Sequence, residues 1–216
     1  MRNSIITALN ELENDHSCRV LFACESGSRA WGFASLDSDF DVRFIYKKPL
    51  EWYLQLDASA DSIDIMLPDD LDLCGWDLRK ALNLFSKGNV CLFEWLGSPE
   101  IYYRDDVFHD QLKGLIPYYF NPKKALYHYL STAKKMQEKH LTSGHVNVKK
   151  IFYIIRPLLA REWIMKNSTM PPTEFELLYL NNDIPQAIRQ HIQDLLLAKN
   201  SSSEKDKVTL PYPQSS

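Results

Sequence analysis

Apolar and polar positions change their spacing along the chain, and the change divides it into two parts. Over residues 2–14, apolar side chains recur at helical spacing, which predicts a first helix. Segments rich in β-forming residues then predict strands at 18–24, 40–46, 62–66 and 71–75, and helical spacing returns at 76–86 and 89–98. This mixture predicts an α/β first part.

Long helical patterns dominate the second part of the chain. They predict helices at 122–139, 146–166, 173–180 and 185–198, and Pro157 should kink the second of these. The last 17 residues are rich in serine and charge, which is typical of a flexible tail. We therefore expect an α/β domain over 1–118, a helical domain over 119–199 and a flexible tail over 200–216.

Composition narrows the class of protein. Hydrophobic residues make up 45% of the 216 positions, which is enough for a packed core and is not typical of disorder. The net charge of −3 does not favour a protein that coats nucleic acid along its whole surface. A local basic face would still suffice to bind one RNA end.

Cysteine usage and the N-terminus bear on the cellular compartment. Cys18, Cys24, Cys74 and Cys91 form no CxxC pair and have no histidine cluster nearby, so we expect reduced thiols rather than a zinc site or disulfides. The first residues are amphipathic and lack the shape of a signal peptide. No segment approaches the roughly 18 apolar residues of a membrane span. These features predict a soluble, cytoplasmic protein without a membrane partner.

Two short features between residues 24 and 46 carry candidate chemistry. Asp39 and Asp41 are two positions apart in a predicted strand, so both carboxylates should project from one face and bind a divalent cation. Gly27 and Ser28 lie in a turn, where backbone N–H groups and a hydroxyl suit phosphate oxygens. Alone, either feature is common on protein surfaces. Because only ten residues separate them, they can share one site for a triphosphate bound through a cation.

These features carry a resemblance to a known family. The segment GSRAWGFASLDSDFDVR resembles the signature of the DNA polymerase beta nucleotidyltransferase superfamily, which is Gly-Ser, about ten residues, and Asp-x-Asp within a strand. It is also similar to the pattern GSRAxGxxxxxSDxDVR of the minimal nucleotidyltransferases associated with RNA ligases. Similarity continues into DLRKALNLFSKGN, FEWLGSPEIYY and KKIFYIIRPLLAREWI, and covers most of residues 18–165. It implies an α+β fold, in which a polymerase-beta-like core with a small mixed sheet and flanking helices precedes a helical domain that completes the cleft.

The resemblance also implies a reaction and its cofactor. Asp39, Asp41 and a third carboxylate would hold two Mg²⁺ ions, with Mn²⁺ as the alternative, while Gly27 and Ser28 hold the phosphates of an NTP such as ATP. Asp72 is our choice for the third carboxylate because it lies in mid-strand just before a helix. Asp64, in the preceding predicted strand, is the alternative.

Further cations and one aromatic residue are candidates for nucleotide binding. Arg29 and Arg43 flank the motif, and Arg43 would project from the same face as Asp41, where it suits a phosphate or the carboxylates themselves. Lys149, Tyr153 and Arg156 occupy one face of a predicted helix. The resemblance favours contacts of these three with the triphosphate and base over a solvated face.

Three functions therefore remain open. The first is a nucleotidyltransferase that moves an NMP to an acceptor hydroxyl on an RNA or tRNA end, a protein side chain or a small molecule. The second is a non-catalytic NTP-binding regulatory module. The third is a structural domain in which the two motifs coincide by chance, which similarity over about 150 residues disfavours. The acceptor, the preferred base and the oligomeric state are left open.

Overall fold

The fold is taken from a computed structural model, which describes residues 1–216 apart from 36–37, 57–59, 142–144, 182, 201–206 and 210–216. Contacts within the chain divide it into two compact units. Unit 1 comprises residues 1–31 and 39–120, and unit 2 comprises residues 32–38 and 121–216.

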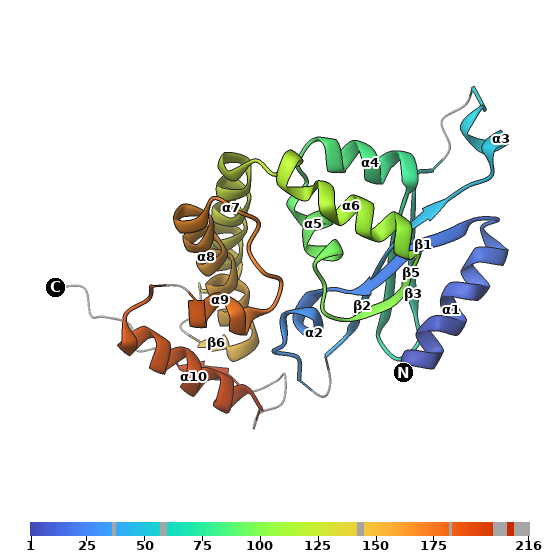
Figure 1. The fold of residues 1–216 in the computed structure, drawn as a ribbon. Helices are drawn as coiled ribbons and strands as arrows, with labels where there is room; N and C mark the ends of the chain where they lie inside the picture. Colours follow the sequence, from blue (N-terminus) through green and yellow to red (C-terminus); the bar gives the residue numbers. More distant parts are fainter. Residues whose placement is uncertain (36–37, 57–59, 142–144, 182, 201–206, 210–216) are drawn as a thin grey trace. The chain divides into compact units, whose positions relative to one another are not determined.

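Unit 1 is built around a five-stranded mixed sheet (Figure 1). Its strands are β1 (Arg19–Glu25), β2 (Phe40–Lys47), β3 (Ser62–Leu67), β4 (Leu71–Asp77) and β5 (Ile101–Arg104). Its helices are α1 (Arg2–Asp15), α2 (Gly27–Trp31), α3 (Leu50–Tyr53), α4 (Leu78–Ser86), α5 (Val90–Leu96) and α6 (Asp106–Tyr119). The spatial order of the strands is β3-β4-β2-β1-β5.

The strand order brings two segments together that are distant in sequence. β2 lies between β1, to which it is antiparallel, and β4, to which it is parallel. In the parallel pair, Asp41 is in register with Asp72 and Arg43 with Cys74. Since residues paired in register project from the same face, one face of the sheet carries side chains from both strands.

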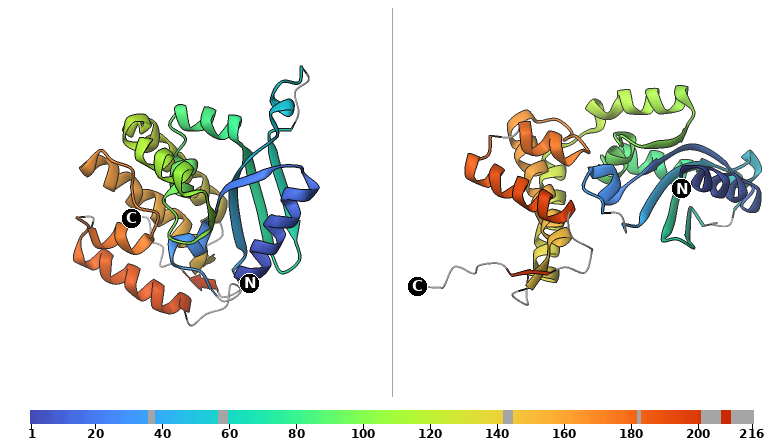
Figure 2. Two further views of the ribbon diagram at one scale, coloured as in Figure 1. Left: turned by 45° about the vertical axis from the view of Figure 1, so that its right-hand side comes forward. Right: turned by 90° about the horizontal axis from the view of Figure 1, so that it is seen from below.

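The helix α1 covers one face of the sheet. The helices α4, α5 and α6 lie on the other face (Figures 1 and 2). Ile5, Leu9 and Leu12 of α1 are buried in a core cluster with Val42 and Phe44 of β2. The predicted helical stripe of residues 2–14 is therefore the core face of α1. The helix α4 begins where Asp77 caps it, because the Asp77 carboxylate accepts a hydrogen bond of 2.9 Å from the Arg79 N–H.

Unit 2 is largely helical. Its helices are α7 (Pro122–His140), α8 (Val148–Asn167), α9 (Phe175–Asn181) and α10 (Gln186–Asn200), and its strands β6 (His145–Asn147) and β7 (Lys207–Thr209) form an antiparallel pair. The helix α8 continues through Pro157. Phe33, from the short segment 32–38, belongs to this unit: its ring centroid lies 5.1 Å from that of Phe152 and 5.5 Å from that of Phe175.

The predicted fold class, a mixed α+β core followed by helices, is confirmed. β5 and α6 were not among the predicted elements, since β5 has only four residues and α6 contains Gly114 and Pro117 within its span. In the segment predicted as a flexible tail, Lys207–Thr209 forms β7 and most of the remainder lies outside the described residues.

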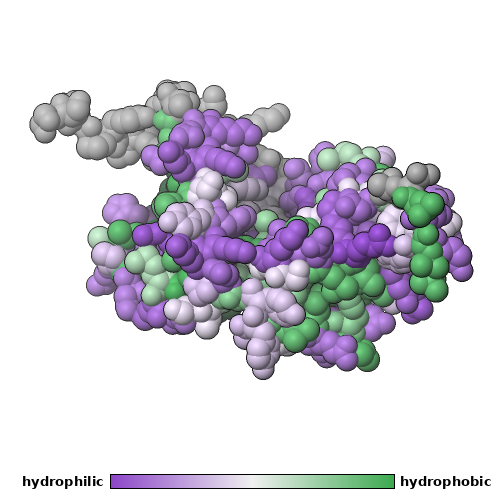
Figure 3. All heavy atoms as spheres, turned by 90° about the horizontal axis from the view of Figure 1, so that it is seen from above, coloured by the Kyte–Doolittle hydropathy of each residue, from purple (hydrophilic) through white to green (hydrophobic). Residues whose placement is uncertain are grey.

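One face of the molecule is mostly polar. The face drawn in Figure 3 is covered chiefly by hydrophilic side chains, with smaller apolar areas between them. Among the described helices, none combines the length and the apolar character needed to cross a membrane.

Candidate functional site

The start of α2, which follows β1 closely, lies directly against a carboxylate of β2. Gly27 has a φ of +60°, a conformation in which glycine has no steric cost. A Cβ at Gly27 would lie 2.1 Å from the Asp41 Oδ2, so only a residue without a side chain allows this approach. The start of α2 and the Asp41 carboxylate of β2 therefore lie side by side, and their use as one phosphate and cation site stays a prediction.

The main chain of Asp41 is held on both sides. The Ser26 N–H donates to the Asp41 carbonyl at 2.8 Å, and the Asp41 N–H donates to the Glu25 Oε1 at 2.8 Å. Glu25 is 1% exposed, and the Tyr102 hydroxyl donates to its other carboxylate oxygen. Burial raises the pKa of Glu25, and the hydrogen bonds from Tyr102 and Asp41 oppose that rise. Sequence reasoning missed Glu25, although it directly precedes the Gly-Ser turn.

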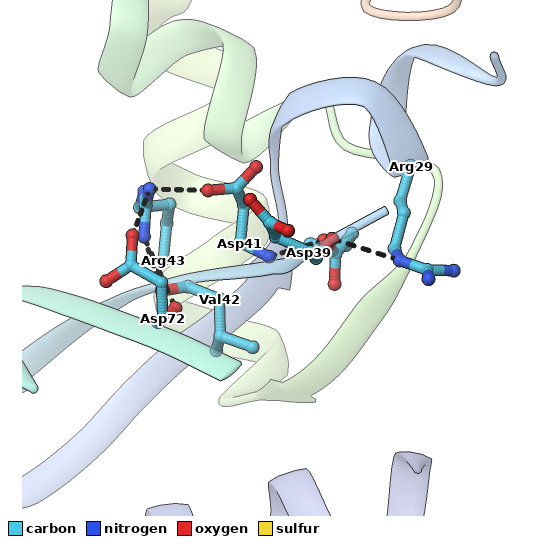
Figure 4. Close-up of polar contacts among 7 residues, drawn as sticks. Arg29, Asp39, Asp41, Val42, Arg43 and Asp72 are labelled. Atoms are coloured by element: carbon cyan, nitrogen blue, oxygen red, sulfur yellow. Dashed lines mark hydrogen bonds and ion pairs between the residues drawn. The ribbon is translucent and has the colours of Figure 1, made fainter. Parts of the chain in front are cut away.

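Asp41 and Asp72 face a single guanidinium group (Figure 4). The Nη2 of Arg43 lies 2.9 Å from the Asp41 Oδ1 and 2.9 Å from the Asp72 Oδ2. Its Nη1 donates to the carbonyl oxygens of Val42 at 3.2 Å and Asp72 at 3.4 Å. Burial is the largest single influence on the pKa of Arg43 and lowers it, but the charges of Asp41 and Asp72 more than offset burial, so the pKa is raised.

Asp39 lies just outside β2 rather than within it, which corrects the prediction that both motif aspartates are strand residues. The strand begins at Phe40, whose N–H donates to the Asp70 carbonyl at 2.9 Å. The Asp39 carbonyl instead accepts a bond of 3.1 Å from the Arg29 Nε, and the side chain is exposed. The Arg29 guanidinium stacks 3.6 Å above the Phe40 ring, so it holds the start of β2.

Ser28 and Asp64 have different surroundings from the paired Asp41 and Asp72. Ser28 is 3% exposed, so the side chain is packed inside unit 1 beside the turn. Asp64 of β3 is in register with Cys74, two residues further along β4 than Asp72. Of the two candidates for a third carboxylate, Asp72 is therefore the one paired with Asp41, and its role as a ligand stays a prediction.

The three candidates in α8 belong to unit 2 and differ in exposure. Lys149 and Tyr153 are half-buried, and the Lys150 ammonium lies 5.5 Å from the centroid of the Tyr153 ring. Arg156 is 3% exposed and donates to the Thr173 carbonyl, at 3.1 Å from Nη2. This placement favours a packing role for Arg156 over the predicted contact with a triphosphate.

The donors around Arg43 fit a divalent cation. Mg²⁺ in proteins typically takes one or two carboxylates and completes its shell with water and substrate phosphates. Asp41 and Asp72 supply two such carboxylates, and a guanidinium nitrogen already stands between them as a cation. Within the part of the chain that the structure describes, no three acidic, histidine or cysteine side chains converge as a metal cluster.

A small mixed sheet with Gly27 and Ser28 next to paired strand carboxylates is consistent with the fold of the polymerase beta nucleotidyltransferase class. The chain belongs to the family described as RlaP, the RNA repair pathway DNA polymerase beta family, whose model matches residues 1–212.

Two known proteins show how far the similarity extends. The uncharacterized protein YcgL of Bacillus subtilis (strain 168) is 40% identical over 206 residues, which are 95% of this chain and 79% of that protein. A crystal structure of a nucleotidyltransferase-like protein from Exiguobacterium sibiricum 255-15 is 12% identical, with a TM-score of 0.36 over 89% of this chain and 74% of that one.

Proposed function

We propose that this protein transfers a nucleoside monophosphate from an NTP to an acceptor hydroxyl and releases pyrophosphate. The observation that carries the proposal is the contact between the Gly27 turn and the Asp41 carboxylate, where a Cβ would lie 2.1 Å from Oδ2. A chain segment that begins with glycine suits phosphates, and the neighbouring Asp41 carboxylate suits a divalent cation, so the contact supports the proposal.

Each residue of the site has a part in this reaction. The main chain at Gly27 and Ser28 would position the triphosphate, and Asp41 and Asp72 would hold the cation, with Asp39 directly before β2. The Mg²⁺, when bound, would neutralise the triphosphate and favour the attacking hydroxyl as the nucleophile. We assign to Asp72 the further role of taking the proton of that hydroxyl. A role of Lys149 and Tyr153 in nucleotide binding stays a separate prediction.

An RNA end is the acceptor that the charge distribution favours. The helices α7 and α8 carry ten lysine or arginine residues and two glutamates, a net charge of +8 in a chain whose total is −3. Nine of these ten cations are exposed or half-buried, and only Arg156 is buried. A concentration of solvent-accessible cations is typical of a surface that binds nucleic acid backbone. The description of the family as an RNA repair pathway supports the same acceptor.

The test is transfer from α-labelled nucleotides. The protein is incubated with each α-labelled NTP, Mg²⁺ and either total cellular RNA or total protein, and the labelled product and pyrophosphate are measured. We expect label in RNA. Label in protein or in a small molecule would keep the transferase and replace the acceptor. Nucleotide binding without pyrophosphate release would instead identify a regulatory module.

Variants of the carboxylates test the assignment of residues. Asp41→Asn and Asp72→Asn should each reduce transfer by more than the roughly 10–100-fold that loss of an outer-shell partner costs. Asp64→Asn is the matched control and should retain transfer, because Asp64 is paired with Cys74 rather than with Asp41. Circular dichroism of each variant checks the fold. Transfer that survives in Asp41→Asn, or that is lost only in Asp64→Asn, would contradict the assignment.

A further inference from the structure

Arg43 occupies the point between the two paired carboxylates. One nitrogen, Nη2, contacts an oxygen of each carboxylate at 2.9 Å, while Nη1 contacts two main-chain carbonyls at 3.2 and 3.4 Å. The guanidinium is therefore held by two charged and two neutral oxygens. These are hard oxygen donors of the type that also bind Mg²⁺ or Mn²⁺.

The arrangement follows from the register of the strands. Asp41 and Asp72 are opposite one another in the parallel pair β2–β4, and two carboxylates at that separation repel unless a cation lies between them. Arg43 follows Asp41 by two residues, so it projects from the same face and provides that cation. The sheet thus carries its own counter-ion.

A divalent cation bound to both carboxylates would compete with this guanidinium. Mg²⁺ binds oxygen at about 2.0–2.1 Å, so it would need the space that Nη2 now fills. Two cations a few ångströms apart repel each other, and the repulsion is strong where water is partly excluded. The side chains are 18% exposed for Arg43, 28% for Asp41 and 30% for Asp72, so an ion can reach the carboxylates from solvent.

We propose that Arg43 is an exchangeable counter-ion, which neutralises Asp41 and Asp72 in the free protein and which a divalent cation displaces when the site is loaded. Arg43 thereby sets the concentration of divalent cation at which Asp41 and Asp72 become occupied. The inference rests on the proposed function, since it concerns the same two carboxylates, but it makes a claim about binding that needs no turnover.

The test is cation affinity in the absence of nucleotide. Mn²⁺ is titrated into the full chain at constant ionic strength, and the free ion is measured by electron paramagnetic resonance. Arg43→Gln removes the competing charge, so we expect Mn²⁺ to bind about tenfold or more tightly than in the unchanged protein. The gain should disappear when Asp41→Asn is added to Arg43→Gln.

Arg104→Gln is the matched control for loss of one positive charge from the same sheet. Arg104 belongs to β5 and pairs with Asp106 at 2.7 Å, away from the two carboxylates. We expect its Mn²⁺ affinity to stay within about twofold of the unchanged protein, because a distant surface charge is screened by salt.

A second variant keeps the proposal testable if Arg43→Gln does not fold. Arg43→Lys retains a charge but cannot make all the bonds of the guanidinium, so its Mn²⁺ affinity should lie between those of the unchanged protein and Arg43→Gln. Mn²⁺ affinity that is unchanged or weaker in every folded Arg43 variant overturns the proposal. Weaker NTP binding with unchanged Mn²⁺ affinity also overturns it and identifies Arg43 as a phosphate ligand.

Failure of the proposed function gives a different result. If Arg43→Gln gains Mn²⁺ affinity but no labelling reaction shows transfer, the proposal for Arg43 is supported and the proposed transferase activity is contradicted. If transfer depends on Asp41 but Arg43→Gln has unchanged Mn²⁺ affinity, the transferase activity is supported and the proposal for Arg43 is contradicted.

Discussion

Gly27 shows how the absence of one side chain shapes the candidate site. Its φ of +60° is in the left-handed region, and its Cα faces the Asp41 carboxylate at a distance that leaves no space for a Cβ. The first property concerns stability, because any other residue is strained there. The second concerns function, because the Asp41 carboxylate would have to turn away from a larger residue.

Gly27→Ala should affect both properties. We expect a loss of about 1–2 kcal/mol in the free energy of unfolding, measured with urea, from the left-handed conformation alone. We also expect nucleotide transfer to be lost, because the Cβ displaces the Asp41 carboxylate.

Gly32→Ala is the matched control for this prediction. Gly32 has a φ of +84°, but a Cβ there would meet nothing within 4 Å. This variant should lose similar stability and retain transfer. Equal loss of transfer in both variants would show that strain, rather than the contact with Asp41, is responsible.

At this scale the sequence predicted that Gly27 and Asp41 lie close together, but it did not predict how the residues around them bond. The proximity of Gly27 and Asp41 follows from a short spacer and a strand-turn pattern, which are local features. The choice between Asp72 and Asp64 depends on which strand lies beside β2 and on the register of that pairing. The local sequence determines neither the neighbouring strand nor the register. The bonds of Arg43 to both carboxylates depend on the same register, so the sequence left its role open.

Among the secondary-structure elements, three strands meet at one buried carboxylate. Glu25 at the end of β1 accepts from the Asp41 N–H of β2 and from the Tyr102 hydroxyl of β5. Its burial raises its pKa, so the folded protein holds the Glu25 proton more tightly than the unfolded chain. The contribution of such a group to the free energy of unfolding is fully present at low pH. It is lost as the pH rises through the pKa of the folded state.

Tyr102→Phe should strengthen this pH dependence. Removal of the hydroxyl takes away a bond that lowers the pKa of Glu25, so the pKa rises further and the charged form costs more. We expect a loss of about 1–3 kcal/mol at neutral pH, with a smaller loss near the ordinary glutamate pKa of 4.5, where the group is largely protonated. Urea unfolding across this pH range measures it.

Tyr103→Phe is the control on the same strand, because Tyr103 is 41% exposed. Its effect should stay within about 0.5 kcal/mol at every pH. A loss in Tyr102→Phe that does not change with pH would show that Glu25 is not involved.

The elements that the sequence failed to predict are those with weak local patterns. β5 is short, and its buried residue Tyr102 is fixed by contacts with β1 and Glu25 that are distant in sequence. In α6, a glycine and a proline weaken the helical pattern, yet the helix is held by burial of His109, Leu112 and Ile116. Helices were predicted at residues 2–14 and 146–166 because apolar side chains recur at helical spacing along the whole of each segment.

On the scale of the whole molecule, the chain contributes two separate segments to each compact unit. The helical part was expected to begin at residue 119, and the division into units does fall after Phe120. However, residues 32–38, which lie between the two halves of the motif, are assigned to unit 2. Phe33 is 3% exposed and packs among the aromatic rings of that unit.

Phe33→Ala should therefore destabilise unit 2. We expect a loss of about 3–5 kcal/mol, with faster hydrogen exchange in α8 and α9, which contain Phe152 and Phe175. Phe22→Ala is the control in unit 1, where Phe22 is fully buried and stacks on His109 at 5.2 Å. It should accelerate exchange in β1 and α6. Faster exchange confined to unit 1 in Phe33→Ala would contradict the assignment.

Because residues 32–38 belong to unit 2, the protein is difficult to divide into two fragments. A fragment that ends at Phe120 would keep Phe33 but lose the aromatic rings that surround it, and a fragment that begins at Asn121 would lack one ring of its own core. A single break after Phe120 therefore separates Phe33 from the ring of Phe152 that it contacts. Split-protein reassembly would need a design in which the peptide around Phe33 is supplied to the C-terminal fragment as a separate insert.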